Sequence, residues 1–183
     1  EPGIAGGNAL NQSIRFAAQG ISCAFIGALG NDQHGQRILA LLNKHQVNVD
    51  LAELKHGSTA TNRIVNDDLG ERFGEPDAWS GGVFENYQIS QNTWQKLAEF
   101  DVWTTHVSCP NFQQTLKRKT QQFLCVDFLH LPDYQVLVAN IEKVDIAYVG
   151  GDESMIETLE NLANATQTLI VLTLGAKGSM AFH

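Results

Sequence analysis

The sequence predicts an α/β fold with three layers: a mostly parallel sheet, helices on both faces, and a projecting β-hairpin. Short apolar strands alternate with helix-length amphipathic segments from residue 91 onward, a pattern typical of parallel sheets covered on both faces. A similar helix–strand–helix order occupies residues 8–45. Between these regions, a β-branched run followed by a cluster of turn residues breaks the rhythm and predicts the hairpin.

In the first part of the chain, helices are expected over 8–19 and 34–45, because apolar residues recur there every three or four positions. Residues 23–26 form a short apolar strand between them. Residues 59–65 and 71–74 are the two predicted strands of the hairpin, with the turn at 66–70 and the whole excursion within 57–76. By its residues alone, this hairpin is either a surface excursion or a lid that closes over a site.

The second part is predicted as repeated strand–helix units. A helix at 91–100 begins after Ser90, whose hydroxyl suits an N-cap. The strands that follow are expected at 102–107, 124–128, 146–149 and 169–172, and the helices at 112–120, 134–140 and 152–164. Ligands bind beyond the carboxyl ends of strands in such sheets. The loops at 27–35, 108–111, 127–132, 149–154 and 173–178 are therefore the candidate site.

Composition excludes several classes of function. The chain has 183 residues and a net charge of −8, which argues against a nucleic-acid surface, since that needs a basic patch. It has no run of 18 apolar residues, so no membrane span is expected. The three cysteines, Cys23, Cys109 and Cys125, are far apart and odd in number, which favours reduced thiols in the cytoplasm. No zinc-binding motif occurs.

The most specific motif lies near the start. Gly6 and Gly7 permit close backbone approach to a ligand, and Asn11 presents an amide from the opening turn of a helix. The run Gly6-Gly7-x-Ala9-x-Asn11-x-Ser13, with Gly20 and Gly30 beyond it, resembles the first signature of the ribokinase-like (PfkB-type) carbohydrate kinases. This resemblance implies a ribokinase-like fold, a lid role for the hairpin, and sugar binding at Gly6, Gly7 and Asn11.

A glycine-containing loop follows the last predicted strand. As a bare pattern, 173–178 is either a β-turn or a backbone cradle for phosphate. Ribokinase-like enzymes carry Thr-x-Gly-x-x-Gly along the nucleotide phosphates, and Thr173, Gly175 and Gly178 match it. Lys177 is read as a solvated side chain that can add a point charge.

Two carboxylates complete the candidate set. Family members often carry Asn-x-x-Glu after the strand at 146–149, linked to magnesium and phosphate. Here Gly150 replaces the Asn and Glu153 keeps the Glu, so Glu153 either serves the nucleotide or complements a helix N-terminus. Asp127 ends a buried strand and is either a loop-capping residue or a substrate ligand. The metal ligands are left open.

The runs 55–60, 72–74 and 80–83 look most like those of fructoselysine 6-kinases. The resemblance implies an ATP- and Mg²⁺-dependent kinase that phosphorylates a hydroxyl of a ketosugar or sugar-amine such as fructoselysine. The alternative is a non-catalytic sugar-binding module derived from such a kinase. A dinucleotide-dependent oxidoreductase is disfavoured, because its GxGxxG spacing is missing. The hairpin is also a candidate contact for a homodimer.

The resemblance covers the whole chain as one incomplete kinase domain, 1–183. Full members begin with a strand whose Asp holds sugar hydroxyls, and they continue to a Gly-Ala-Gly-Asp segment whose Asp is the catalytic base. Neither segment occurs between Glu1 and His183. We therefore expect a fragment that lacks the catalytic Asp and has no meaningful turnover by itself.

Overall fold

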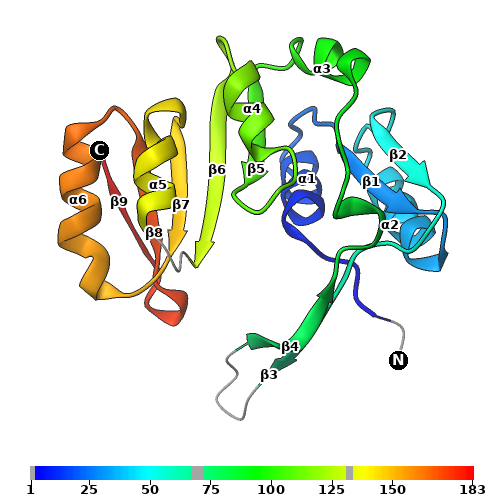
Figure 1. The fold of residues 1–183 in the computed structure, drawn as a ribbon, viewed down its shortest axis with the longest axis horizontal. Helices are drawn as coiled ribbons and strands as arrows, with labels where there is room; N and C mark the ends of the chain where they lie inside the picture. Colours follow the sequence, from blue (N-terminus) through cyan, green and yellow to red (C-terminus); the bar gives the residue numbers. More distant parts are fainter. Residues whose placement is uncertain (1–2, 67–71, 131–133) are drawn as a thin grey trace. The chain divides into compact units, whose positions relative to one another are not determined.

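The computed structural model describes residues 3–66, 72–130 and 134–183, apart from the side chains of residues 72, 73 and 75. Within it the chain forms two compact units, Glu1–Ile89 and Ser90–His183 (Figure 1). Each unit is described by itself. The predicted turn at 66–70 falls largely outside the described residues, as does the end of the predicted loop 127–132. The single domain over 1–183 stays a prediction.

The first unit is built around a short parallel pair of strands. Helix α1 (Asn8–Ala18) precedes β1 (Gly27–Gly30), and α2 (Gln33–Lys44) leads to β2 (Ala52–Lys55). Strands β1 and β2 pair in parallel, with Gly27 opposite Ala52. Their core is a cluster of five buried apolar residues from the helices, β1 and the connecting segments: Leu10, Phe25, Leu29, Leu42 and Val47.

The strand predicted at 23–26 was placed too early. Only Ala24 forms an isolated bridge there, with Asn48, and the strand proper is the Gly-Ala-Leu-Gly run of β1. The prediction was based on the apolar residues at 23–26. The position of a strand also depends on its pairing partner. Here the partner is β2, which was not predicted and which pairs with 27–30.

The hairpin is present and longer than predicted. Strand β3 (Thr61–Asn66) pairs antiparallel with β4 (Arg72–Ser80), and a short 3₁₀ turn, η1 (Gly82–Phe84), follows. The returning strand was expected to end at residue 74. It continues past Pro76 because the register shifts between Asn62 and Ile64, and a proline is tolerated at such an irregularity of an edge strand.

The second unit is a five-stranded sheet in the order β5-β6-β7-β8-β9. The strands are β5 (Val102–His106), β6 (Phe123–His130), β7 (Ile146–Gly150), β8 (Leu169–Thr173) and β9 (Ser179–Phe182). The first four are parallel, and β9 runs antiparallel to β8. The α-helices are α3 (Gln91–Leu97), α4 (Phe112–Arg118), α5 (Tyr134–Asn140) and α6 (Ile156–Ala165). Short 3₁₀ turns are η2 (Ile141–Lys143), η3 (Glu153–Met155) and η4 (Gly175–Lys177).

Alternate residues along these strands form the core of the second unit. Leu124, Val126 and Phe128 of β6 are fully buried, and the ring of Phe128 meets that of Phe112 of α4 edge-on at 6.1 Å. On the other face of the same sheet, alternate residues such as Tyr148 are partly exposed. The period of two seen in the sequence therefore separates a buried from a less buried face.

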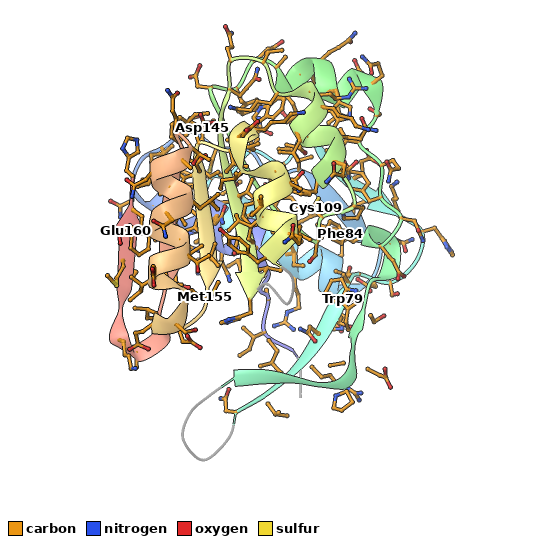
Figure 2. All side chains as sticks on the ribbon, turned by 60° about the vertical axis from the view of Figure 1, so that its left-hand side comes forward. Trp79, Phe84, Cys109, Asp145, Met155 and Glu160 are labelled. Carbon is orange, nitrogen blue, oxygen red and sulfur yellow. The ribbon has the colours of Figure 1, made fainter. Side chains whose placement is uncertain are left out.

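The two ends of this sheet are chemically different. At the amino end, the Asp145 carboxylate accepts a hydrogen bond from the Leu124 amide at 2.7 Å and forms an ion pair with Lys119 at 2.9 Å. At the carboxyl end, Met155 closes the turn after β7. Figure 2 shows Asp145 and Met155 at these opposite ends. The candidate nucleotide residues lie at the Met155 end.

Candidate functional site

The start of α1 leaves room for a ligand. Gly7 is its N-cap residue with φ of 102°, and no side chain caps this helix. A Cβ at Gly6 or Gly7 would have no heavy atom within 4 Å. Gly7 is thus required by its backbone conformation and not by crowding. The backbone amide of Asn11 donates to the Gly7 carbonyl at 3.0 Å, as part of the helix. The side-chain amide of Asn11 is exposed and can bind an external partner.

A carboxylate that was not singled out from the sequence organises the segment before the hairpin. Asp32 is the N-cap of α2, and it accepts from the Gly35 amide at 2.8 Å. It also accepts from the Thr59 amide at 2.8 Å and the Thr59 hydroxyl at 2.6 Å. The hydrogen bond from the Thr59 hydroxyl, followed by those from the Gly35 and Thr59 amides, lowers the pKa of Asp32 from 3.8 to about 2. An Asp two residues before the helix predicted at 34–45 was the available sequence signal.

Glycines allow backbone segments to touch around Ser58 and Thr59. A Cβ at Gly30 would lie 2.4 Å from the Thr59 nitrogen, and one at Gly82 would lie 2.2 Å from the Ser58 carbonyl oxygen. The Val83 amide donates to that same carbonyl at 2.9 Å. The start of the hairpin is therefore held by close backbone packing, and no residue larger than glycine fits at positions 30 and 82.

In the second unit, the turns after β7 and β8 lie side by side. Gly150 and Thr173 are partners at the ends of these strands, and the Gly151 amide donates to the Thr173 carbonyl at 3.1 Å. The Thr173 hydroxyl donates to the Val149 carbonyl at 3.3 Å. Residues near 150 and 173 thus share one edge, as expected from the parallel strands.

The loop after β8 has the conformation expected of a glycine-dependent turn. Gly175 and Gly178 have φ of 57° and 92°, and nothing lies within 4 Å of a Cβ built at either. The Leu174 amide donates to the Gly178 carbonyl at 2.8 Å, closing the loop. A turn that is closed by its own hydrogen bond and has open space beside its glycine backbone can hold a phosphate group.

The predicted helix at 152–164 begins as the 3₁₀ turn η3 and becomes α-helical only at Ile156. Asp152 causes this, because its carboxylate accepts from the Ser154 amide two residues on, at 2.8 Å. Such a local turn competes with a regular first helical turn.

Glu153 and Lys177 join the two turns. The Lys177 ammonium donates to Glu153 Oε1 at 2.5 Å, with exposed side-chain fractions of 68% and 50%. This hydrogen bond lowers the pKa of Glu153 and raises that of Lys177. Lys177 is solvent-exposed, as expected, and it also has a specific partner on the neighbouring turn.

Asp127 lies at the same carboxyl edge, on β6 next to β7. Its Oδ1 accepts from the Leu129 amide at 2.8 Å, and Leu129 has φ of 60°. Asp127 faces His106 across the β5–β6 register. Burial lowers the pKa of His106 and the charge of Asp127 partly opposes this. The observed bond matches the loop-capping interpretation, and the substrate role stays a prediction.

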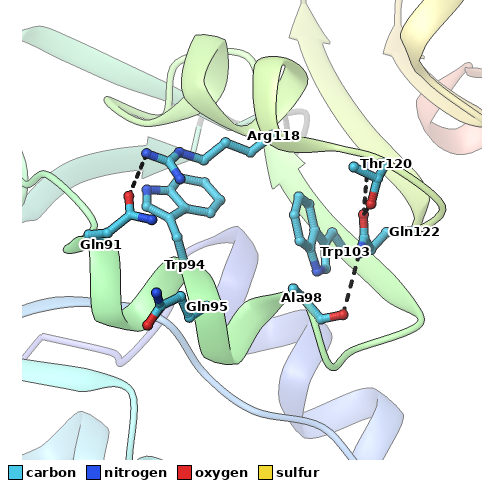
Figure 3. Close-up of a pocket in the computed structure, with 8 residues that line it drawn as sticks. All are labelled: Gln91, Trp94, Gln95, Ala98, Trp103, Arg118, Thr120 and Gln122. Carbon is cyan, nitrogen blue, oxygen red and sulfur yellow. Dashed lines mark hydrogen bonds between the residues drawn. The ribbon is translucent and has the colours of Figure 1, made fainter.

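A hollow of about 250 Å³ lies elsewhere, at the amino end of the same sheet (Figure 3). Its walls include Trp94 and Trp103, with ring centroids 5.9 Å apart. The Arg118 guanidinium lies over Trp94 at 5.1 Å and donates to the Gln91 side chain at 2.9 Å. None of the predicted site residues lines this hollow. Both tryptophans are buried, as expected for packing residues.

The structure thus brings together Thr173, Gly175, Gly178 and Glu153 in the second unit. Asp127 shares their edge, and Gly6, Gly7 and Asn11 form a separate turn in the first unit. Within the described ranges 3–66, 72–130 and 134–183, no group of three or more His, Cys, Asp or Glu side chains is placed to hold a metal ion. No described helix has the length and apolar character needed to cross a membrane.

Residues 4–183 match the profile of the pfkB family carbohydrate kinases. The chain belongs to this family, so the assignment made from the Gly6–Gly30 signature is confirmed. Fructoselysine 6-kinase of Escherichia coli (strain K12) is 25% identical over 184 residues, which cover 98% of this chain and 69% of the relative. Fructosamine kinase FrlD of Bacillus subtilis (strain 168) is 34% identical over 68 residues, covering 37% of this chain and 24% of the relative.

Solved structures confirm the ribokinase-like α/β fold. Ribokinase from Thermotoga maritima matches with a TM-score of 0.69 and 16% identity, over 97% of this chain and 63% of that one. Arabidopsis thaliana ribokinase, complexed with ribose and ATP, matches with a TM-score of 0.74 and 17% identity, again over 97% and 63%. The chain therefore spans about 63% of the length of these ribokinases.

Proposed function

We propose that the protein is an ATP-dependent sugar kinase acting on a hydroxyl of a ketosugar or sugar-amine such as fructoselysine. The observation that carries the nucleotide part is the pairing of an open glycine turn at 173–178 with the Glu153–Lys177 ion pair. Two relatives named as fructoselysine or fructosamine kinases support the acceptor class.

The residues at this edge fit a nucleotide phosphate with a cation. The backbone at Gly175 and Gly178 has open space above it, and Lys177 supplies a positive charge. ATP would supply the transferred phosphoryl group, and Mg²⁺ would neutralise charge on its phosphates. Magnesium in such sites is held by one or two carboxylates together with substrate phosphates, which suits a single Glu153.

The substrate side is assigned to the turn at Gly6 and Gly7 with Asn11, and to Asp127. The Asn11 amide has both donor and acceptor atoms, as a polyhydroxylated ligand requires. The uncapped N-terminus of α1 has no acidic residue in its first turn, so it does not repel an electron-rich hydroxyl. The proposed roles of the hairpin, as lid and as homodimer contact, are supported by exposed Ile64 and Trp79 on β3 and β4.

The test is ADP release by the full-length protein with fructoselysine, fructose, ribose and nucleosides as acceptors. We expect fructoselysine or a similar ketosugar adduct to be preferred. A clear preference for a nucleoside would refute the acceptor class and leave the kinase assignment standing. Sugar binding without ADP release from any acceptor would favour the alternative, a non-catalytic sugar-binding module.

The two assigned subsites should separate in binding experiments. Asn11→Ala removes one hydrogen-bonding partner, an effect of roughly 1–3 kcal/mol, so sugar affinity should fall about 5- to 150-fold and ATP affinity should hardly change. Gly175→Val should do the reverse, because a side chain there would project into the space assigned to phosphate. Titration of each ligand into each variant measures both effects.

Two matched variants control for general damage. Asn43→Ala changes an exposed helical asparagine of α2, and Gly20→Val changes a glycine with φ of 77° and open space around its Cβ position. Neither should alter affinity for either ligand. Loss of ATP binding with retained sugar binding in Asn11→Ala would show that the subsites are assigned wrongly.

A further inference from the structure

Lys177 connects two turns that have opposite tasks in the proposed function. It belongs to η4, in the glycine turn assigned to phosphate, and its ammonium donates a hydrogen bond to Glu153 on the other turn. Glu153 is assigned to the cation. One ammonium therefore lies between the proposed anion site and the proposed cation site.

The carboxylates on the turn after β7 make this ammonium important for a polyanion. Asp152 and Glu153 are adjacent and both exposed, and the only cation that faces them is Lys177, among the described residues of η3, η4 and the flanking strand ends. A nucleotide phosphate approaching Gly175 meets two negative charges and one positive charge. Like charges at short range oppose binding unless a positive group offsets them.

The ion pair is also easy to exchange. Exposed pairs of Lys with a carboxylate contribute about 0–1 kcal/mol in water, so their separation costs little. The lysine side chain is flexible and carries three donors, and contact with a phosphate replaces one charge-assisted hydrogen bond by another. The Glu153 carboxylate that Lys177 leaves is then available to a cation.

We propose that Lys177 is shared between Glu153 and the nucleotide, so that phosphate and Glu153 compete for one ammonium and phosphate binding releases Glu153 for the cation. This inference rests on the proposed function, since it requires a nucleotide at the glycine turn. Glu153 then lowers the affinity for the nucleotide without the cation and raises that affinity with the cation. If the ion pair served only to hold the two turns together, Glu153 would raise the affinity in both cases.

The test is calorimetric titration of ADP into the full-length protein, without Mg²⁺ and then with it. Lys177→Met should weaken Mg²⁺-free ADP about 10-fold, and Lys177→Arg should restore most of that loss. Glu153→Gln should instead tighten Mg²⁺-free ADP about 2- to 5-fold. The gain in ADP affinity that Mg²⁺ produces should be smaller in Glu153→Gln than in the unmodified protein.

The control pair is Lys143→Met and Glu142→Gln, which change the same charges on exposed residues of the turn η2 before β7, at the other end of the sheet. Neither should alter ADP affinity beyond a small uniform effect of net charge. Weaker Mg²⁺-free ADP binding in both Lys177→Met and Glu153→Gln, or no change in either, overturns the inference alone. No ADP binding to the unmodified protein overturns the proposed function together with it.

Discussion

Replacing Gly35 by alanine is expected to destabilise the first unit by about 3 kcal/mol. A Cβ at this position would lie 2.0 Å from the Gly30 carbonyl oxygen and 3.0 Å from the Thr59 hydroxyl oxygen. Gly35 lies in α2, where alanine by itself favours the helix by about 1 kcal/mol. The clash with backbone outweighs this gain, because neither β1 nor the first turn of α2 can move without breaking its hydrogen bonds.

Urea denaturation followed by circular dichroism measures the effect as a shift of the midpoint. Gly3→Ala is the matched control, since nothing lies within 4 Å of a Cβ there, and its midpoint should stay unchanged. A Gly35→Ala protein as stable as the unmodified one would show that the contact between α2 and β1 is looser than described.

The second large effect is expected at Asp32. Asp32→Ala removes the N-cap of α2 and three hydrogen bonds, and it leaves the Thr59 amide without its acceptor. Loss of a cap and of bonds to a charged group should destabilise the protein by about 2–4 kcal/mol. Asp32→Asn should lose less, because asparagine is also a good cap. Denaturant midpoints of the three proteins measure the order.

The same carboxylate predicts a pH dependence. The pKa of Asp32 is lowered in the folded protein to about 2, from 3.8, so its stabilising contribution is complete above about pH 4. It is lost as the pH falls through about 2, because the protonated carboxyl binds the two amides less well. The difference in stability between the unmodified protein and Asp32→Asn should therefore narrow from pH 5 to pH 2.5. A constant difference over that range would contradict the assigned network.

The elements that the sequence predicted well are those with local causes. The strand–helix order of the second unit follows from apolar periodicity, and α5, described over Tyr134–Asn140, ends at Asn140 as expected. The Ser90 hydroxyl accepts from the Thr93 amide at 3.1 Å and begins α3. The glycine-containing loop predicted at 173–178 is also local: Gly175 and Gly178 have positive φ, a conformation that favours glycine in any fold.

Features that depend on distant partners were not readable in the same way. Strand β1 was misplaced because its pairing with Ala52–Lys55 is not encoded within either segment, and β4 continues beyond Pro76 because a register shift accommodates it. Lys177 finds Glu153 24 residues away, and Asp32 finds Thr59 27 residues away. A pattern within a few residues does not indicate which distant residue will be the partner.

By itself, then, the sequence determined the class of fold, the family through its glycine and asparagine spacing, and the residues proposed for sugar and phosphate. Tertiary structure decided which of them meet: Glu153 joins the glycine turn through Lys177, and Thr173 pairs with Gly150 at the ends of β8 and β7. The physical reason is that propensity, periodicity and backbone conformation act within a few residues. Ion pairs, strand registers and backbone contacts at glycine arise only when separate segments are packed together.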